Sequence, residues 1–161
     1  MTLVDTHCHL NAPPLGTDPD AVLTRATARG VTRAIVPSSD EASWPDVAAA
    51  ATRENLFAAY GLHPWVAHEV RPGALLAEFE RRLASQLSNS PHGAIGEIGL
   101  DTKIEESGLP EQLPVLESQL ALARDLELPV ILHCRGAFEE LLTAVNKHGG
   151  KLQGVLHAYS R

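Results

Sequence analysis

The sequence predicts an α/β fold of the (β/α) TIM-barrel type, and three observations support this class. Short β-type runs alternate with helical patterns along the whole 161-residue chain, which indicates parallel strands joined by helical crossovers. Residues 10–14, which follow the first strand, lack the G-x-G-x-x-G pattern of a dinucleotide-binding sheet, so that open, doubly wound alternative is disfavoured. A complete barrel has eight strands in about 250 residues, so we expect an incomplete barrel with about six of the eight βα units.

Six strands and four helices can be assigned from the spacing of apolar residues. The strands are expected at residues 3–10, 32–37, 56–62, 94–100, 129–134 and 154–159. Each of the last five strands follows a segment with helical character, and the clearest helices are expected at 20–29, 74–87, 111–127 and 137–148. In the last of these, Phe138, Leu141 and Val145 have the i, i+3, i+7 spacing of an amphipathic helix. No linker or repeat interrupts the pattern, so residues 1–161 are expected to form a single domain.

The composition and the distribution of apolar residues indicate a cellular location. Hydrophobic residues make up 44% of the chain and charged residues 20%, so the chain can bury a full core. The sequence does not begin with a basic leader and a long apolar run, and no apolar stretch approaches the roughly 18 residues that a membrane span needs. We therefore expect a cytoplasmic protein with no membrane contact.

Charge and a few unusual residues restrict the classes of partner. The formal net charge of −7 argues against a broad basic surface for nucleic acid, although a local metal centre can still attract phosphate. Cys8 and Cys134 each lie beside a histidine and are expected to be small buried thiols rather than a disulfide. Trp44 and Trp65 are expected to be packing residues rather than stacking platforms for bases.

Histidines gather at the expected ends of the strands. Five of the eight histidines lie there, namely His7, His9, His63, His133 and His157. In parallel barrels the active site forms at the carboxyl ends of the strands, so these side chains are expected to converge. His7 and His9 also share one strand face, because alternate residues of a strand point the same way, and two adjacent imidazoles can clamp a metal ion.

Glu97 adds a carboxylate to this set near the end of the fourth expected strand. It shares a strand face with Asp101, and His133 shares one with Arg135. Nitrogen and oxygen donors together suit zinc, manganese, nickel or iron, and several histidines do not suit calcium. A single carboxylate between two histidine groups can bridge two metal ions, which polarise a phosphoryl oxygen and lower the pKa of a shared water. The pattern therefore predicts hydrolytic chemistry.

Each of these residues also has a purely structural interpretation. Taken singly, His133 or His157 is more often a core histidine with satisfied hydrogen bonds than a metal ligand. Glu97 could be the buried partner of Arg135. The metal centre is the favoured interpretation because so many possible ligands occur at equivalent strand ends.

Five motifs, in order along the chain, resemble the TatD-type metal-dependent hydrolases, the deoxyribonuclease-like branch of the amidohydrolase-type barrels. They are DTHCH (5–9), GLHP (61–64), GEIGLD (96–101), PVILHCR (129–135) and HAYS (157–160). Together they cover essentially the whole chain. GEIGLD separates this family from its relatives, which often carry a carboxylated lysine as the metal bridge at the end of strand four, where this sequence has Glu97.

The resemblance implies two kinds of site residue. Five residues would be ligands of two divalent metal ions: His7 and His9 on the first, His133 and His157 on the second, and Glu97 as a bridge between them. His63 and Arg135 would lie close to the substrate and face a phosphate, for which the planar guanidinium of arginine is suited. The metal is not distinguished among zinc, manganese, magnesium, nickel and iron.

The resemblance also implies an activity. The family is associated with hydrolysis of phosphodiester bonds in DNA, so the expected function is that of a deoxyribonuclease or phosphodiesterase that uses a metal-activated water on DNA or a nucleotide. One alternative is hydrolysis of an amide, a lactone or a phosphomonoester, because fold alone does not fix function. Another is a metal- or phosphate-binding fragment without turnover.

The sequence stops just after the sixth expected strand. In the family a later strand supplies an aspartate that completes the first metal site and handles a proton, and this aspartate has no counterpart before Arg161. Asp101 matches a different family position, so no catalytic residue is assigned. We expect a truncated form of a longer hydrolase, or else a natural short product or a dimer that completes its barrel. Open barrel edges would favour self-association.

Overall fold

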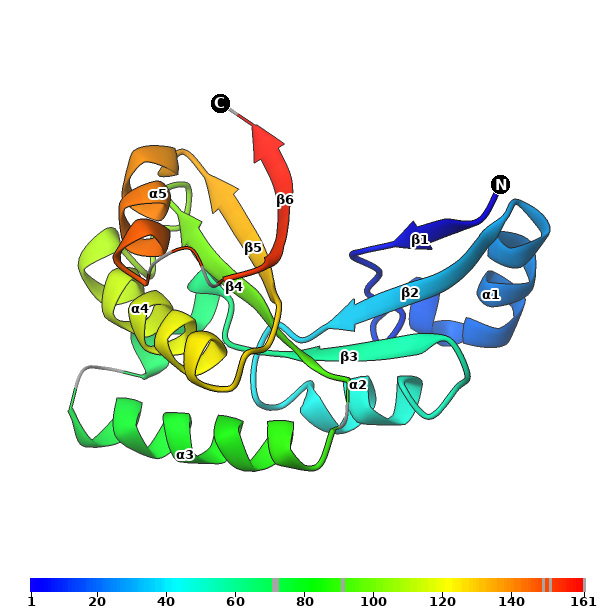
Figure 1. The fold of residues 1–161 in the computed structure, drawn as a ribbon, viewed down its shortest axis with the longest axis horizontal. Helices are drawn as coiled ribbons and strands as arrows, with labels where there is room; N and C mark the ends of the chain where they lie inside the picture. Colours follow the sequence, from blue (N-terminus) through cyan, green and yellow to red (C-terminus); the bar gives the residue numbers. More distant parts are fainter. Residues whose placement is uncertain (71–72, 91, 149, 151, 161) are drawn as a thin grey trace.

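Six parallel strands form one curled sheet in the computed structural model, which describes residues 1–70, 73–90, 92–148, 150 and 152–160 (Figure 1). Strands that follow one another in the sequence are also neighbours in the sheet, and each neighbouring pair is parallel. The strands are β1 (Leu3–Asp5), β2 (Val31–Pro37), β3 (Leu56–Tyr60), β4 (Ala94–Asp101), β5 (Val130–Arg135) and β6 (Gly154–Ser160).

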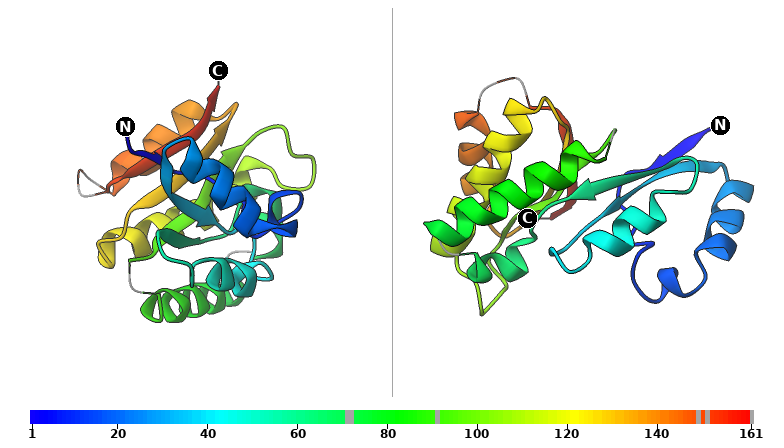
Figure 2. Two further views of the ribbon diagram at one scale, coloured as in Figure 1. Left: turned by 90° about the vertical axis from the view of Figure 1, so that its right-hand side faces the viewer. Right: turned by 90° about the horizontal axis from the view of Figure 1, so that it is seen from below.

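The helices cover the outer, convex side of the sheet, and β1 and β6 form the two edges of the curl (Figures 1 and 2). They are α1 (Pro19–Ala28), α2 (Trp44–Ala50), α3 (Ala74–Ser88), α4 (Leu109–Asp125) and α5 (Phe138–Lys147), with short 3₁₀ turns η1 (Leu15–Thr17) and η2 (Pro64–Glu69). This arrangement confirms the expected incomplete barrel. The helix between β2 and β3 is short, and the spacing of apolar residues does not define its bounds.

The core lies between the sheet and the helical layer. Phe79 and Leu83 of α3 and Leu116 and Leu120 of α4 are buried there against the outer face of the sheet. Every residue of β4 is buried, so this strand runs through the centre of the molecule. No helix in the described part of the chain is long and apolar enough to cross a membrane.

Two strands end earlier than the sequence predicts. β1 stops at Asp5 because the chain turns there: the His7 amide donates to Asp5 Oδ1, and the Leu10 amide donates to the Cys8 carbonyl. β3 stops at Tyr60, and the His63 amide then donates across to the Ser39 carbonyl. The histidines after these strands therefore lie on loops beyond the strand ends.

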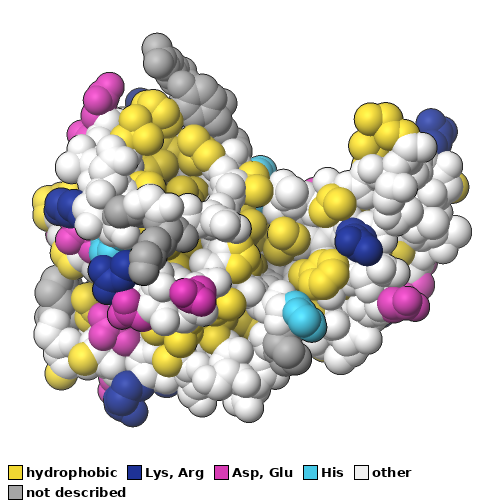
Figure 3. Space-filling model, viewed as in Figure 1, with side chains coloured by type: hydrophobic (Ala, Val, Ile, Leu, Met, Phe, Trp, Pro, Cys, Tyr) yellow, Lys and Arg dark blue, Asp and Glu magenta, His cyan; other side chains and the backbone are white. Residues whose placement is uncertain are grey.

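The inner side of the curl is hollow. The space-filling view shows a depression between the end of the molecule that carries β1 and the end that carries β6, with apolar side chains along its walls (Figure 3). Ile131, Ala59 and Ala94 form a small separate apolar cluster. Ile131 lies two residues before His133 on β5, so both side chains face the same side of the sheet. Cys8 and Cys134 are both free thiols, as expected, but Cys134 is buried whereas Cys8 is only partly buried.

Candidate metal centre

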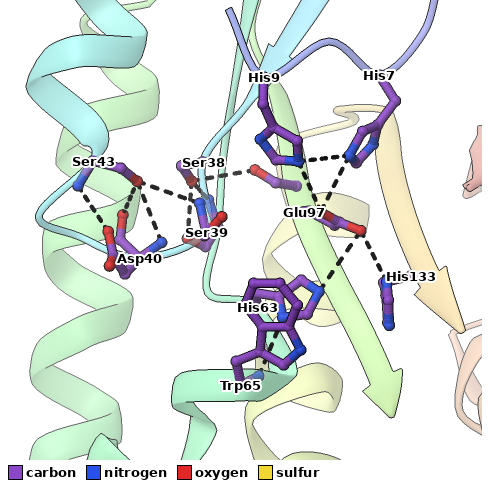
Figure 4. Close-up of polar contacts among 12 residues, drawn as sticks. His7, His9, Ser38, Ser39, Asp40, Ser43, His63, Trp65, Glu97 and His133 are labelled. Atoms are coloured by element: carbon purple, nitrogen blue, oxygen red, sulfur yellow. Dashed lines mark hydrogen bonds and ion pairs between the residues drawn. The ribbon is translucent and has the colours of Figure 1, made fainter. Parts of the chain in front are cut away.

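Glu97, on the central strand β4, has a carboxylate that faces imidazoles from three other parts of the chain (Figure 4). Glu97 is buried, with 3% of its surface exposed. Oε2 lies 3.3 Å from Nε2 of His7 and 3.7 Å from Nε2 of His9. Oε1 lies 3.0 Å from Nδ1 of His133 and 3.8 Å from Nε2 of His63. A buried carboxylate surrounded by imidazoles is therefore the centre of the site.

These side chains form two groups that share Glu97. In the first group His7, His9 and Glu97 each offer a ligand atom, and in the second group His63, Glu97 and His133 do so. Within each group the ligand atoms all lie within 4.8 Å of one another. Each oxygen of the carboxylate thus faces a different group, an arrangement that would allow the carboxylate to bridge two metal ions.

The loop that carries His7 and His9 is held against the neighbouring strand. The Cys8 amide donates to the Ile35 carbonyl of β2 over 2.9 Å, and the His7 amide donates to Asp5 Oδ1 over 3.0 Å. The His7 ring also stacks on His157 of β6, with ring centroids 3.5 Å apart and planes 7° from parallel. The loop after β1 is therefore held by β2 on one side and by the His157 ring of β6 on the other.

The protonation preferences of the site follow from burial and hydrogen bonding. Burial opposes the charge of Glu97, but hydrogen bonds with His133 and His7 outweigh it and hold the pKa of Glu97 well below its usual range. Burial lowers the pKa of His63 to about 4, against the opposing charge of Glu97. Burial and the neighbouring His7 also lower the pKa of His9. Burial opposes the charge of His133, but hydrogen bonds with Glu97 and Asp101 outweigh it and raise the pKa of His133. The site therefore pairs an ionised carboxylate with the neutral imidazoles of His63 and His9, the form in which both kinds of side chain bind metals.

The first histidine group fits a divalent metal ion. Nε2 of His7 and Nε2 of His9 lie only 3.0 Å apart and both face the same carboxylate oxygen. Nδ1 of His7 is buried and has no hydrogen-bond partner among the described residues, so the ring is not fixed by an ordinary core contact on that side. Two imidazole nitrogens and a carboxylate oxygen suit zinc, manganese, nickel or iron.

His63 has a different role from the other imidazoles, because its Nδ1 is already used. Nδ1 accepts a hydrogen bond from the Trp65 amide over 3.2 Å, so the proton of the neutral ring resides on Nε2. Nε2 is the nitrogen that points towards Glu97. A protonated nitrogen donates hydrogen bonds and does not bind a metal ion, which favours His63 as a hydrogen-bond donor within the site.

A pocket of about 450 Å³ opens over both groups. Besides the histidines and Glu97, its lining includes Leu15 and Trp65, and Trp65 is 55% exposed. Trp44, in contrast, is buried against Tyr60 and Phe79, as the sequence predicts for a packing residue. Trp65 packs edge-on against the His63 ring, with centroids 4.3 Å apart, and leaves much of its surface open beside the pocket.

Two expected site residues belong to neither of the two ligand groups. His157 lines the pocket but stacks on His7, and the second group contains His63 in its stead. Arg135 is exposed at the end of β5 and does not belong to the described residues that line the pocket. The roles of His157 as a ligand and of Arg135 at the substrate stay predictions.

The site also depends on polar residues that the sequence pattern did not single out. Ser38, just beyond β2, is fully buried beside the site. Its hydroxyl donates to the Gly61 carbonyl over 3.0 Å and accepts from the Gly61 amide over 2.9 Å. Its carbonyl accepts from the Glu97 amide over 3.0 Å. Ser38 therefore joins the segments that precede His63 and contain Glu97.

Replacing Ser38 by Ala is expected to lower the free energy of unfolding by about 1–3 kcal/mol, because the buried Gly61 amide loses its acceptor. Urea unfolding followed by circular dichroism measures the change. Ser88→Ala is the matched control, since that exposed hydroxyl donates only to the Ala84 carbonyl of its own helix. Equal effects of the two substitutions would show that Ser38 does not hold the strands together.

Two buried glutamines of α4 support the same strand ends. Gln119 accepts from the Leu62 amide over 2.8 Å and donates to the Leu62 carbonyl over 3.3 Å, next to His63. Gln112, two helical turns earlier, makes the same pair of bonds to Asp101, each over 2.8 Å. Their seven-residue spacing on one helix face is the signal that could have identified them, because amides on an apolar stripe need buried partners.

Comparisons with known proteins agree with this geometry. The sequence model of the family described as TatD related DNase matches residues 4–161. The uncharacterized metal-dependent hydrolase YjjV of Escherichia coli is 37% identical over 161 residues, which cover 98% of this chain and 60% of YjjV. The 3'-5' ssDNA/RNA exonuclease TatD of Pantoea ananatis is 31% identical, again over 98% of this chain and 60% of the relative.

A solved structure shows the same fold. The crystal structure of YjjV, a TatD homologue from Escherichia coli, matches 99% of this chain with a TM-score of 0.85 and 35% sequence identity. The match covers 61% of the YjjV chain. The present chain thus spans about 60% of the length of the curated relatives it matches.

Proposed function

Because the chain belongs to the TatD related DNase family, we propose that it carries the metal centre of a divalent-metal-dependent phosphodiesterase. The observation that carries this proposal is the position of Glu97 between two histidine groups that open onto one pocket. We further propose two metal ions, with His7 and His9 on one, His133 and His157 on the other, and Glu97 on both. The donor set suits zinc, manganese, nickel or iron, and we propose that the native metal is one of these or magnesium.

The residues of the site would divide the work of hydrolysis. Divalent ions, when bound, supply positive charge for a developing phosphoryl transition state and lower the pKa of a water molecule. His63, neutral and protonated on Nε2, would donate a hydrogen bond to a phosphate oxygen, which fits its buried place on the pocket wall. Arg135 would approach the phosphate from the exposed end of β5.

The proposed substrate is a phosphodiester of DNA or of a nucleotide. Support comes from the relative that is named as a single-stranded DNA and RNA exonuclease and from the family description. The net charge of −7 gives the chain no general attraction for nucleic acid, so recognition would depend on the metal centre and the groups around it. The pocket also provides an exposed aromatic ring, Trp65, beside the site.

Activity assays test this proposal. The protein is incubated with Mn²⁺, Mg²⁺ or Zn²⁺ and with bis(p-nitrophenyl) phosphate or end-labelled single-stranded and duplex DNA. We expect hydrolysis that stops on addition of EDTA and in the Glu97→Gln variant. Hydrolysis of p-nitrophenyl phosphate or of a carboxylic ester instead would assign the site to another bond. Metal binding without turnover of any of these compounds would identify a metal- or phosphate-binding module.

We propose that residues 1–161 act as a single structural domain, because the described strands form one continuous sheet. Two free cysteines fit a reducing compartment, and we propose the cytoplasm.

Self-association through the open edges of the sheet is a further part of this proposal. Leu3 and Val4 of the edge strand β1 are 41% and 52% exposed, and an uncovered parallel edge offers unpaired backbone groups to a second copy. Size-exclusion chromatography with light scattering is expected to show a mass above the 17.3 kDa of one chain, rising with concentration. Val4→Lys is expected to reduce that mass, because a charge on an edge strand opposes pairing. A single-chain mass at every concentration would contradict the proposal.

A further inference from the structure

Asp101, at the end of β4, lies on the opposite side of the His133 ring from Glu97. Oδ2 of Asp101 is 3.0 Å from Nε2 of His133, and Oε1 of Glu97 is 3.0 Å from Nδ1 of the same ring. Asp101 is 1% exposed and Glu97 3% exposed, so neither carboxylate is satisfied by bulk water. The imidazole is therefore held between two buried carboxylates, one at each ring nitrogen.

Neighbouring groups fix the orientation of the Asp101 carboxylate. Its Oδ1 accepts a hydrogen bond from the Lys103 amide over 2.8 Å. Its backbone amide donates to Gln112 Oε1, and its carbonyl accepts from Gln112 Nε2, each over 2.8 Å. Gln112 is itself 1% exposed. With the backbone held by α4 and Oδ1 occupied, Oδ2 is the oxygen that faces His133.

We propose that Asp101 is a positioning residue that fixes the tautomer of His133. By accepting a hydrogen bond from Nε2–H, Asp101 leaves the lone pair of Nδ1 available for a divalent ion that is shared with Glu97. Histidines that bind metals commonly donate their second ring N–H to a carboxylate or carbonyl, which fixes the ring and raises its basicity. This inference rests on the proposed metal-binding function and extends it to a residue outside the ligand set.

The contacts of Asp101 make its amide analogue an informative variant. In Asp101→Asn the side-chain oxygen is expected to keep the place of Oδ1, because the Lys103 amide donates to that position and an NH₂ group there could not accept the hydrogen bond. The NH₂ group then takes the place of Oδ2 and donates to Nε2 of His133. The remaining ring proton moves to Nδ1, the nitrogen that faces Glu97, and blocks the metal.

The test compares metal affinity and the tautomer of His133 in the wild type, Asp101→Asn and Asp101→Ala. Zn²⁺ affinity is measured by isothermal titration calorimetry. The ring nitrogens are observed by ¹⁵N NMR of histidine-labelled protein loaded with Zn²⁺, with the His133 signals assigned from a His133→Gln variant. Asp125→Asn is the control, since that exposed carboxylate pairs with Arg124 at the end of α4.

The wild type is expected to carry its His133 proton on Nε2 and Zn²⁺ on Nδ1. Asp101→Ala is expected to lower Zn²⁺ affinity about 10–100-fold, as the loss of a hydrogen-bond partner of a metal-binding histidine usually does. Asp101→Asn, although isosteric, is expected to lower it further, because it reverses the hydrogen bond rather than removing it. Asp125→Asn should leave the affinity unchanged.

Three results would overturn the inference. The first is a Zn²⁺-loaded wild type in which His133 binds metal through Nε2 or lacks the Nε2 proton. This test uses the wild type alone, so it does not depend on the folding of a variant. The second is an Asp101→Asn variant with wild-type affinity. The third is a greater loss of Zn²⁺ affinity in Asp101→Ala than in Asp101→Asn, which is the result expected if the Asp101 side chain acts only by packing. If the wild type itself binds no divalent metal, the proposed function fails instead.

Discussion

Glu97→Gln is expected to remove divalent metal from both histidine groups. The carboxylate supplies one oxygen to each group, and its lowered pKa keeps it charged at neutral pH. A neutral amide keeps the shape but offers one oxygen and one NH₂ group, so it cannot serve both sides. Loss of a hydrogen-bond partner of a metal ligand can lower metal affinity by up to about 100-fold. Loss of Glu97, a proposed ligand itself, should lower the affinity by more. Metal content after dialysis, measured by mass spectrometry of the elements, together with calorimetry, checks this.

Glu106→Gln is the matched control for that substitution. Glu106 is exposed in the loop that follows β4, so the control changes the net charge by the same amount at a distance from the site. Its metal content is expected to equal that of the wild type. If Glu97→Gln kept full occupancy at both groups, the bridging role of Glu97 would be wrong. If it lost metal at one group alone, Glu97 would be a ligand of that ion only.

Gly99→Ala is expected to destabilise the fold by at least about 3 kcal/mol. Gly99 pairs with His133 in the register of β4 and β5, and its φ is +152°. A Cβ atom there would overlap the carbonyl oxygen of His133, which is backbone and cannot move without separating the two strands. Those strands carry Glu97 and His133, so the substitution disturbs the site as well as the sheet. Urea unfolding followed by circular dichroism measures the loss.

Gly73→Ala separates the effect of backbone conformation from that of the overlap. Gly73 also has a positive φ, +107°, but an added Cβ atom would meet nothing within 4 Å. The control should cost about 1–3 kcal/mol, the usual range for a side chain in such a conformation. Gly99→Ala should be the more damaging change, because the overlap with the His133 carbonyl adds to that cost. Equal losses would show that the close approach of β4 and β5 at Gly99 is not essential.

Much of the fold could be predicted because it depends on periodic burial. The alternation of strands and helices identified all six strands, and the bounds of β4 and β5 differ from the expected ones by only one residue. The expected strand at 3–10 was too long, because the local hydrogen bond from the His7 amide to Asp5 turns the chain after Asp5. Side-chain bonds of this kind compete with strand pairing and leave little trace in hydrophobic spacing.

The candidate site could be predicted in its composition but not in its contacts. Histidines at strand ends pointed to His7, His9 and His133 around Glu97, and the structure brings these side chains together. The place of His63 inside the second group depends on how far the loop after β3 folds inward, which the sequence does not specify.

The polar residues that support the site were not predicted from the sequence. Ser38, Gln112 and Gln119 act through hydrogen bonds to backbone groups of segments 11 to 58 residues away in the chain. A serine after a strand or a glutamine on a helix is too common to indicate such a bond by itself. The spacing of the two glutamines can indicate that they are buried, but their partners are known only from the three-dimensional structure.

The most direct test of the account is anomalous scattering from crystals of the wild-type protein grown with Mn²⁺ or Zn²⁺. The account predicts one metal peak on each side of the Glu97 carboxylate, one beside His7 and His9 and the other beside Nδ1 of His133. Metal peaks elsewhere, with neither oxygen of Glu97 coordinated, would contradict it.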